Sequence, residues 1–168
     1  VCVVIETDGG YGPDSITMIG AYDGQTVRTF VADENLQEAA DYLEGFPLLV
    51  TYNGAFFDMP LLRQCFSHRL RNHLHLDLRF PLHRLGYRGG LKAIEKAMNL
   101  ARSPETEGLT GWDAVRLWRE SCAGSSDAMQ LLKAYNAEDA RNLWPLADEV
   151  FARMSTALEK RLRENCRP

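Results

Sequence analysis

Two apolar runs, at residues 15–22 and 26–31, are joined by Asp23-Gly24, and they constrain the fold more than any other stretch of the chain. An Asp-Gly pair between strand-like runs is a strong hairpin signal, because the turn needs residues that accept positive φ angles. A third short apolar run precedes them at residues 1–5. We therefore expect the chain to begin with a three-stranded antiparallel unit.

Helical and strand patterns alternate through the middle of the chain. Residues 35–43 have apolar side chains at helical spacing, with Asp33 as the expected cap and Gly45 as the stop. A strand, a helix and another strand are then predicted at residues 47–52, from about Asp58 with Pro60 in the first turn, and at residues 73–78.

The last part of the chain has a helical pattern. Short amphipathic helices are predicted at residues 91–98 and 113–120, and a helical region from about Asp127 that Pro145 is expected to bend or divide. The whole order predicts an α/β fold, in which a mixed sheet of about five strands is flanked by helices.

Length and composition agree with one globular domain over residues 1–168, because a chain of 168 residues with 45% apolar content can bury a core. Val1 already has the character of a strand interior, as in a domain cut from a longer chain. No apolar stretch reaches the roughly 20 residues that span a bilayer, so no membrane partner is expected. The four cysteines are scattered, which favours a reducing, cytoplasmic setting.

Charge is distributed unevenly, although the net charge is only −4. The first 60 residues contain ten acidic side chains and one basic one, Arg28. In residues 61–93 the only acidic side chain is Asp77, and the basic ones are Arg63, Arg69, Arg71, Arg79, Arg84, Arg88 and Lys92. Such a division suits a metal site beside a phosphate-backbone track, and it equally suits a solvated, arginine-rich surface.

Three acidic residues, far apart in the sequence, each end a distinctive segment. Glu6 follows the first apolar run, and Asp58 closes the string Tyr-Asn-Gly-Ala-Phe-Phe-Asp that starts at Tyr52. Asp139 lies four residues after Tyr135, so both share one face of the predicted helix. Taken singly, Glu6 also fits a solvated strand end and Asp58 a helix cap.

Together these segments resemble the three motifs of the 3'→5' exonucleases with an RNase H-like fold, in the subclass that pairs a tyrosine with the last aspartate. Residues 52–62 and 90–95 carry most of that resemblance, which extends from Val3 to about Leu146. The sister subclass has a histidine five residues before the aspartate, where this chain has Ala134.

The resemblance implies the site and its partners. Glu6, Asp58 and Asp139 would be metal ligands, Tyr135 the catalytic tyrosine, and two Mg²⁺ or Mn²⁺ ions the cofactors. The substrate would be single-stranded DNA or RNA. Residues expected to contact the strand are Asn53, Arg63, Arg84, Arg88 and Lys92.

One position departs from the family pattern. The first motif normally reads Asp-x-Glu, and the aspartate position is Val4, which offers no ligand to a metal. Three explanations remain open: a substitution in this chain, replacement by Asp8 from the following loop, or loss of catalysis with retention of binding.

Three further groups of residues are possible sites. His73, His75 and Asp77 would share one strand face, either as a zinc site or, as we prefer, as a polar face with Asp77 near the cleft. The aromatic residues Trp112 and Trp118 are expected in the core rather than stacked on bases. Glu138 is expected to face solvent.

The sequence thus predicts a metal-dependent 3'→5' exonuclease for single strands, weakened by Val4. The alternative is a non-catalytic RNase H-like module that binds nucleic acid or a protein. A carboxylate-metal phosphohydrolase acting on small nucleotides is a weaker third possibility.

Overall fold

The computed structural model describes residues 1–66 and 69–165. A five-stranded sheet with the order β3-β2-β1-β4-β5 forms its centre. Strands β1, β2 and β3 pair antiparallel, whereas β4 pairs parallel with β1 and β5 parallel with β4. The strands are β1 (Cys2–Thr7), β2 (Ile16–Tyr22), β3 (Val27–Val31), β4 (Leu48–Thr51) and β5 (Leu74–Asp77). The predicted mixed α/β sheet is confirmed.

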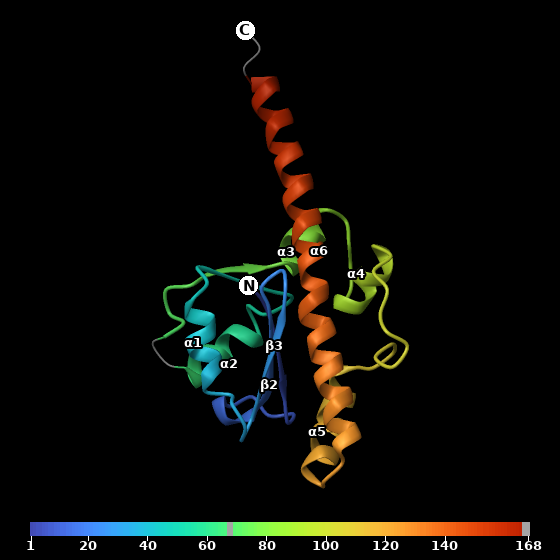
Figure 1. The fold of residues 1–168 in the computed structure, drawn as a ribbon. Coiled ribbons are helices and arrows are strands. Elements are labelled where there is room, and N and C mark those ends of the chain that lie inside the picture. Colours follow the sequence, from blue (N-terminus) through green and yellow to red (C-terminus); the bar gives the residue numbers. More distant parts are fainter. Residues whose placement is uncertain (67–68, 166–168) are drawn as a thin grey trace.

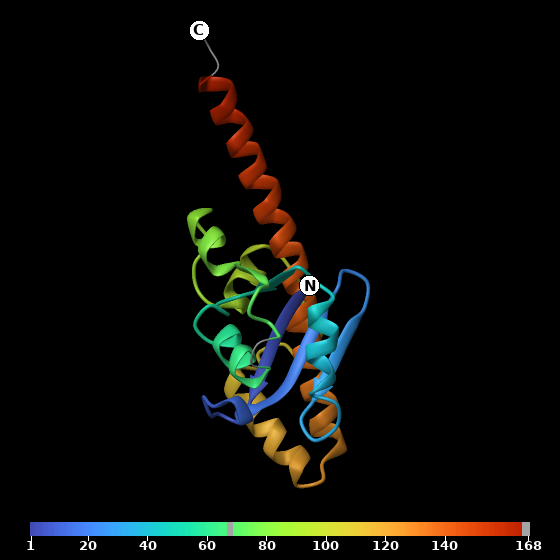
Figure 2. The same cartoon turned by 90° about the vertical axis from the view of Figure 1, so that its left-hand side faces the viewer.

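Helices cover both faces of the sheet (Figures 1 and 2). One face packs against α1 (Glu38–Glu44) and α2 (Asp58–Cys65), and the other against α6 (Ser126–Asn165). The remaining helical segments are η1 (Pro13–Ser15), α3 (Arg79–Arg84), α4 (Leu91–Ala97) and α5 (Gly111–Cys122).

Alternation along β1 decides which side chains reach each face. Val3 and Ile5 join the apolar cluster shared with α1 and α2. Cys2 and Val4 point to the opposite face, toward α6. Glu6 follows in the same alternation, and a register shift between Glu6 and Thr7 marks the end of the ladder with β2. The first predicted motif therefore lies on the α6 side of the sheet.

Two predicted helix features are wrong. Helix α1 begins at Glu38 rather than near Asn35, and Asp33 does not cap it. Asp33 instead has a φ of 62° in the turns that precede the helix, where the Asn35 side chain accepts a hydrogen bond from the Val31 amide. Pro145 does not divide α6, which continues through it as one helix.

The C-terminal part of α6 projects beyond the body of the domain (Figures 1 and 2). Its exposed apolar side chains are Phe151, Met154, Leu158 and Leu162. None of the helices in the described ranges has the length and apolar content needed to cross a bilayer.

Candidate active site

Glu6, Asp58, Tyr135 and Asp139 line one cleft of about 560 Å³. They come from the end of β1, the start of α2 and the N-terminal half of α6, and they are all nearly inaccessible to solvent. Val4 and Lys92 line the same cleft. The topology thus brings together the four residues that the sequence motifs single out, and places the departing position beside them.

Asp58 is held by the backbone of β1. Its Oδ1 accepts a hydrogen bond of 3.1 Å from the Ile5 amide, and no side chain caps the start of α2. The bond ties the first residue of α2 to the strand that carries Glu6. Asp58 is therefore used as a positioned cleft carboxylate and not as a helix cap.

Asn136 fixes Glu6 from the other side of the cleft. Its side-chain amide donates to the Glu6 carboxylate over 3.2 Å and lies 3.4 Å from the Val4 carbonyl oxygen. Asn136 is fully buried between α6 and β2, where Gly20 leaves room for it. Sequence reasoning did not single out Asn136, although its place in the third motif is a signal that could have found it.

Burial raises the pKa of each cleft carboxylate. The pKa of Glu6 rises to about 8, first through desolvation and then through the charge of Asp139. The pKa of Asp58 rises to about 7, again mainly through desolvation. Desolvation also raises the pKa of Asp139, against the opposing effect of Lys92 and Arg102. Acidic groups with such shifts gather where a cation or a proton is to be held.

Lys92 and Arg102 supply the positive charge of the cleft. The Lys92 ammonium donates a 2.6 Å hydrogen bond to the Tyr135 hydroxyl and lies 4.0 Å from Asp139 Oδ2. The Arg102 guanidinium forms an ion pair with Asp139 and two 2.7 Å hydrogen bonds with Glu95. Sequence reasoning did not predict Arg102. Glu95 is a buried acid on a helix and needs a basic partner, and that need is the signal that could have pointed to Arg102.

The donor set suits Mg²⁺ or Mn²⁺ in chemical type, because both prefer hard oxygen ligands. Its arrangement does not match a two-ion site. The Val4 side chain has no oxygen that could bind a metal, and Asp139 Oδ1 is already engaged in an ion pair with Arg102. Over residues 1–66 and 69–165, no three His, Cys, Asp or Glu side chains are placed to hold one ion.

Asp8 does not replace the missing ligand. It is exposed, and its Oδ1 accepts a 2.8 Å hydrogen bond from the Gly10 amide within its own loop. It is not among the residues that line the cleft. The hypothesis that Asp8 takes the place of the first-motif aspartate is therefore not supported.

The strand face of His73, His75 and Asp77 is not a zinc site, because the three side chains bind separate partners. His73 hydrogen-bonds the Leu43 carbonyl over 3.2 Å, and His75 hydrogen-bonds the Thr51 hydroxyl over 2.8 Å. Asp77 accepts hydrogen bonds from the backbone amides of Asn53, Ala55 and Arg79. Asp77 thus shapes the loop that leads from β4 into the cleft.

Two expectations about exposure are wrong. Glu138 does not face solvent: its carboxylate accepts hydrogen bonds from the Ser103 amide and the Thr106 hydroxyl and lies 3.6 Å from Arg102. Trp112 does not enter the core, since 79% of it is exposed, whereas Trp118 packs against the core as expected. Trp112 directly follows Gly111, which lines the cleft.

The predicted strand contacts fall in different places. Lys92 lines the cleft, and Asn53 lines a hollow beside it. Arg63 is exposed on α2, and Arg88 is exposed next to the hollow, where it donates to the His83 and Tyr87 carbonyls. Arg84 lines a separate groove against the projecting part of α6.

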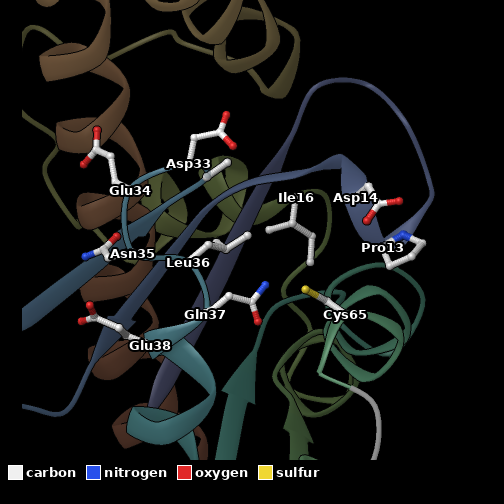
Figure 3. A pocket seen from close by; sticks show the side chains of 11 residues that line it. Pro13, Asp14, Ile16, Asp33, Glu34, Asn35, Leu36, Gln37, Glu38 and Cys65 are labelled. Atoms are coloured by element: carbon white, nitrogen blue, oxygen red, sulfur yellow. The ribbon is translucent and has the colours of Figure 1, made fainter.

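Another hollow of about 520 Å³ lies between η1 and the loop before α1 (Figure 3). Its charged lining residues are all acidic: Asp14, Asp33, Glu34 and Glu38. No basic side chain lines it, so it is unsuited to a phosphate. The cleft at Glu6 is the better candidate for nucleic-acid chemistry.

Comparison with known proteins agrees with this geometry. Residues 1–151 match the family RNase_H_2 of the RNase_H superfamily, and the chain belongs to this family. No protein with a curated description matches the chain.

A structural likeness supports the same fold. The chain resembles the family B DNA polymerase from the hyperthermophilic archaeon Pyrobaculum calidifontis, with a TM-score of 0.70 and 15% sequence identity. The match covers 89% of this chain and 24% of the polymerase chain. At this identity the likeness concerns the fold, which is RNase H-like.

Proposed function

We propose that this chain is a metal-dependent nuclease domain that removes nucleotides from single-stranded nucleic acid in the 3'→5' direction. The observation that carries the proposal is the convergence of Glu6, Asp58, Asp139 and Tyr135 on one cleft. Membership of the RNase H superfamily supports it, as does likeness to a DNA polymerase, a protein that handles nucleic acid strands.

Glu6, Asp58 and Asp139 are the residues that would hold Mg²⁺ or Mn²⁺. If these carboxylates held a divalent ion, it would supply an activated water and neutralise charge on the phosphate. The chain itself contributes the fixed carboxylates, which the Ile5 amide and the Asn136 side chain hold in place. For Asp139 to serve as a ligand, Arg102 has to release it.

Tyr135 acts as a hydrogen-bond donor and not as a base. Burial raises the pKa of its hydroxyl, so the proton stays on the oxygen at neutral pH. Lys92 donates to that oxygen and the hydroxyl itself hydrogen-bonds Asp139, so a phosphate oxygen would take the place of Asp139 as the acceptor. Lys92 therefore orients Tyr135 and adds positive charge where a phosphate would bind.

Val4 should limit this activity. It lies on the α6 side of β1, two residues before Glu6, and lines the cleft, so an aspartate there would add a fourth carboxylate. Without it a metal has fewer oxygen ligands, and an error in the position of the attacking water is costly. We expect Mn²⁺ to support more activity than Mg²⁺, because it tolerates distorted coordination better.

The direct test is a nuclease assay on end-labelled single-stranded DNA and RNA, with Mg²⁺ or Mn²⁺, for the unmodified chain and Val4→Asp. The expected result is weak cleavage that rises in Val4→Asp and disappears in Val4→Asp/Asp139→Asn. Brisk cleavage by the unmodified chain in Mg²⁺ would contradict our account of Val4.

A second candidate function is favoured by the ion pair between Arg102 and Asp139 together with Val4. Both features remove metal ligands and are compatible with a domain that binds nucleic acid or a protein without cleaving. If neither the unmodified chain nor Val4→Asp cleaves, while both bind one of these partners, the binding function replaces the nuclease function.

A further inference from the structure

We propose that the hollow beside the cleft is a second nucleotide subsite, in which Arg79 binds a backbone phosphate and Phe56 and Phe80 stack on an unpaired base. The inference rests on the proposed nuclease function and deepens it, because it identifies the feature that selects a single strand. The proposal concerns Arg79, Phe56 and Phe80, to which the three sequence motifs give no role.

The hollow and the cleft adjoin one another. The hollow has a volume of about 570 Å³, and Tyr52, Gly90 and Leu91 line both it and the cleft. We infer that a strand whose terminal phosphate lies at Lys92 would pass Tyr52 to reach the hollow. The nucleotide there would be a neighbour of the one that is removed.

Arg79 is positioned in advance for a phosphate. Its guanidinium donates a 2.6 Å hydrogen bond to Asn53 Oδ1. The backbone amide of Asn53 in turn donates a 2.7 Å hydrogen bond to Asp77 Oδ1. Asn53 has a φ of 62°, in the left-handed region, and the hydrogen bond from its backbone amide to Asp77 holds it there. The partner of the guanidinium is a neutral amide oxygen, which leaves its positive charge for a ligand.

The lining of the hollow favours an anion. None of its lining residues is acidic, and Arg79 and His83 are both basic types. Gly89 and Gly90 let a backbone approach closely, and the Tyr52 hydroxyl fixes this loop through a 2.5 Å hydrogen bond to the Gly89 carbonyl. The hollow therefore has the guanidinium of Arg79 on one side and the backbone of Gly89 and Gly90 on another. A cationic side chain and accessible backbone suit a phosphodiester.

Two exposed aromatic rings lie next to this subsite in the sequence and pair in space. Phe80 follows Arg79, and Phe56 lies in the loop between Asn53 and Asp58. Their ring centroids are 6.3 Å apart, and 69% of Phe56 and 51% of Phe80 are exposed. Neither ring lines the hollow, but Phe80 is the chain neighbour of Arg79, which does. Exposed aromatic rings combined with a cationic groove bind single strands, since unpaired bases stack on such rings and paired bases are already stacked.

The test is binding of a fluorescein-labelled oligothymidine, measured by anisotropy in EDTA so that no cleavage occurs. Phe56→Ala/Phe80→Ala should weaken binding roughly 5- to 150-fold, the range found for removal of a stacked base. Arg79→Gln should also weaken binding and should reduce its dependence on salt. Melting curves check that each variant is folded, and Phe80→Ala alone provides a surface variant if Arg79→Gln fails to fold.

Matched controls come from the separate groove at α6. Arg161→Gln and Phe151→Ala remove an arginine and an exposed phenylalanine that line that groove, and they should leave binding unchanged. An oligonucleotide of the same length with abasic sites should bind the wild type weakly and be insensitive to Phe56→Ala/Phe80→Ala.

In the binding assay, three outcomes would overturn the subsite: equal losses in the control variants, equal losses with the abasic strand, or no binding by the wild type in EDTA. The nuclease function is judged separately, by cleavage with Mn²⁺ and Val4→Asp. Cleavage that persists in Phe56→Ala/Phe80→Ala with unchanged KM would refute the subsite and leave the nuclease intact.

Discussion

The Lys92 ammonium donates a hydrogen bond to the Tyr135 hydroxyl over 2.6 Å and lies 4.3 Å from the centre of the Tyr135 ring. The two residues are 43 positions apart and belong to α4 and α6. One cation thus contacts both the oxygen and the ring face of the tyrosine, so α4 sets the direction in which α6 presents it. The same ammonium lies 4.0 Å from Asp139 Oδ2.

Lys92→Met should lower the nuclease activity of the Val4→Asp chain by about tenfold or more, because a hydrogen bond to a charged group is worth roughly 1.5–3 kcal/mol. The loss should fall on kcat more than on KM if Lys92 orients Tyr135. Lys96→Met, an exposed lysine of the same helix, is the control. Equal effects of both variants would show that Lys92 acts only through general charge.

Arg102→Gln should destabilise the fold by about 3–5 kcal/mol, because it leaves the buried carboxylate of Glu95 without its cationic partner and with only the Asn142 amide as a donor. Glu95 is 1% exposed, and the Arg102 side chain is 7% exposed. Glu95→Gln/Arg102→Gln should recover much of that loss. Urea unfolding measures both effects.

The control for Arg102 is Arg69→Gln. Arg69 pairs with Asp41 and Glu44 at the surface, where 40% of its side chain is exposed, and such pairs contribute about 0–1 kcal/mol. If Arg102→Gln were as mild as Arg69→Gln, the Arg102 network would not be a structural element of the site.

Local strand and helix patterns were sufficient to predict the sheet, whereas the four cleft residues followed from the resemblance of their segments to the exonuclease motifs. Glu6 is near the end of β1, Asp58 begins α2, and Tyr135 and Asp139 lie on α6, so it is the fold that brings them to one cleft. Arg102 could not be placed, because it lies in an irregular segment and its contact with Asp139 spans 37 residues. Glu138 was misjudged for the same reason: its partners Ser103 and Thr106 are in that segment.

Stability should fall as the pH rises through the neutral range. The pKa of Glu6 is raised from 4.5 to about 8 and that of Asp58 from 3.8 to about 7. A carboxyl group whose pKa is higher in the folded state binds its proton more tightly there, so stability is lost between the unfolded and the folded pKa values. Each group contributes a slope of at most about 1.4 kcal/mol per pH unit.

Urea unfolding in EDTA from about pH 4 to about pH 9 measures this dependence, because the stability changes between the unfolded and the folded pKa values of each group. Glu6→Gln should flatten the curve and be more stable than the wild type at high pH. Glu38→Gln, at an exposed position of α1, is the control. A wild-type curve that rises toward pH 8 would refute the assigned shifts.

Gly20→Ala tests how closely α6 must approach the sheet. A Cβ atom at Gly20 would overlap the side-chain amide of Asn136, which is fully buried and donates to Glu6. Overpacking of this kind typically costs about 1–3 kcal/mol, and a displacement of the Asn136 amide would disturb its hydrogen bond to Glu6. We therefore expect lower stability in urea and, in the Val4→Asp chain, lower nuclease activity.

Gly12→Ala is the matched control for Gly20→Ala. A Cβ atom at Gly12 meets no atom within 4 Å, and its φ of −94° suits an L-residue. It should leave both measurements unchanged. If Gly20→Ala lowered stability but left activity intact, Asn136 would support the packing of α6 without positioning Glu6, because the displaced amide would then have no consequence for the cleft.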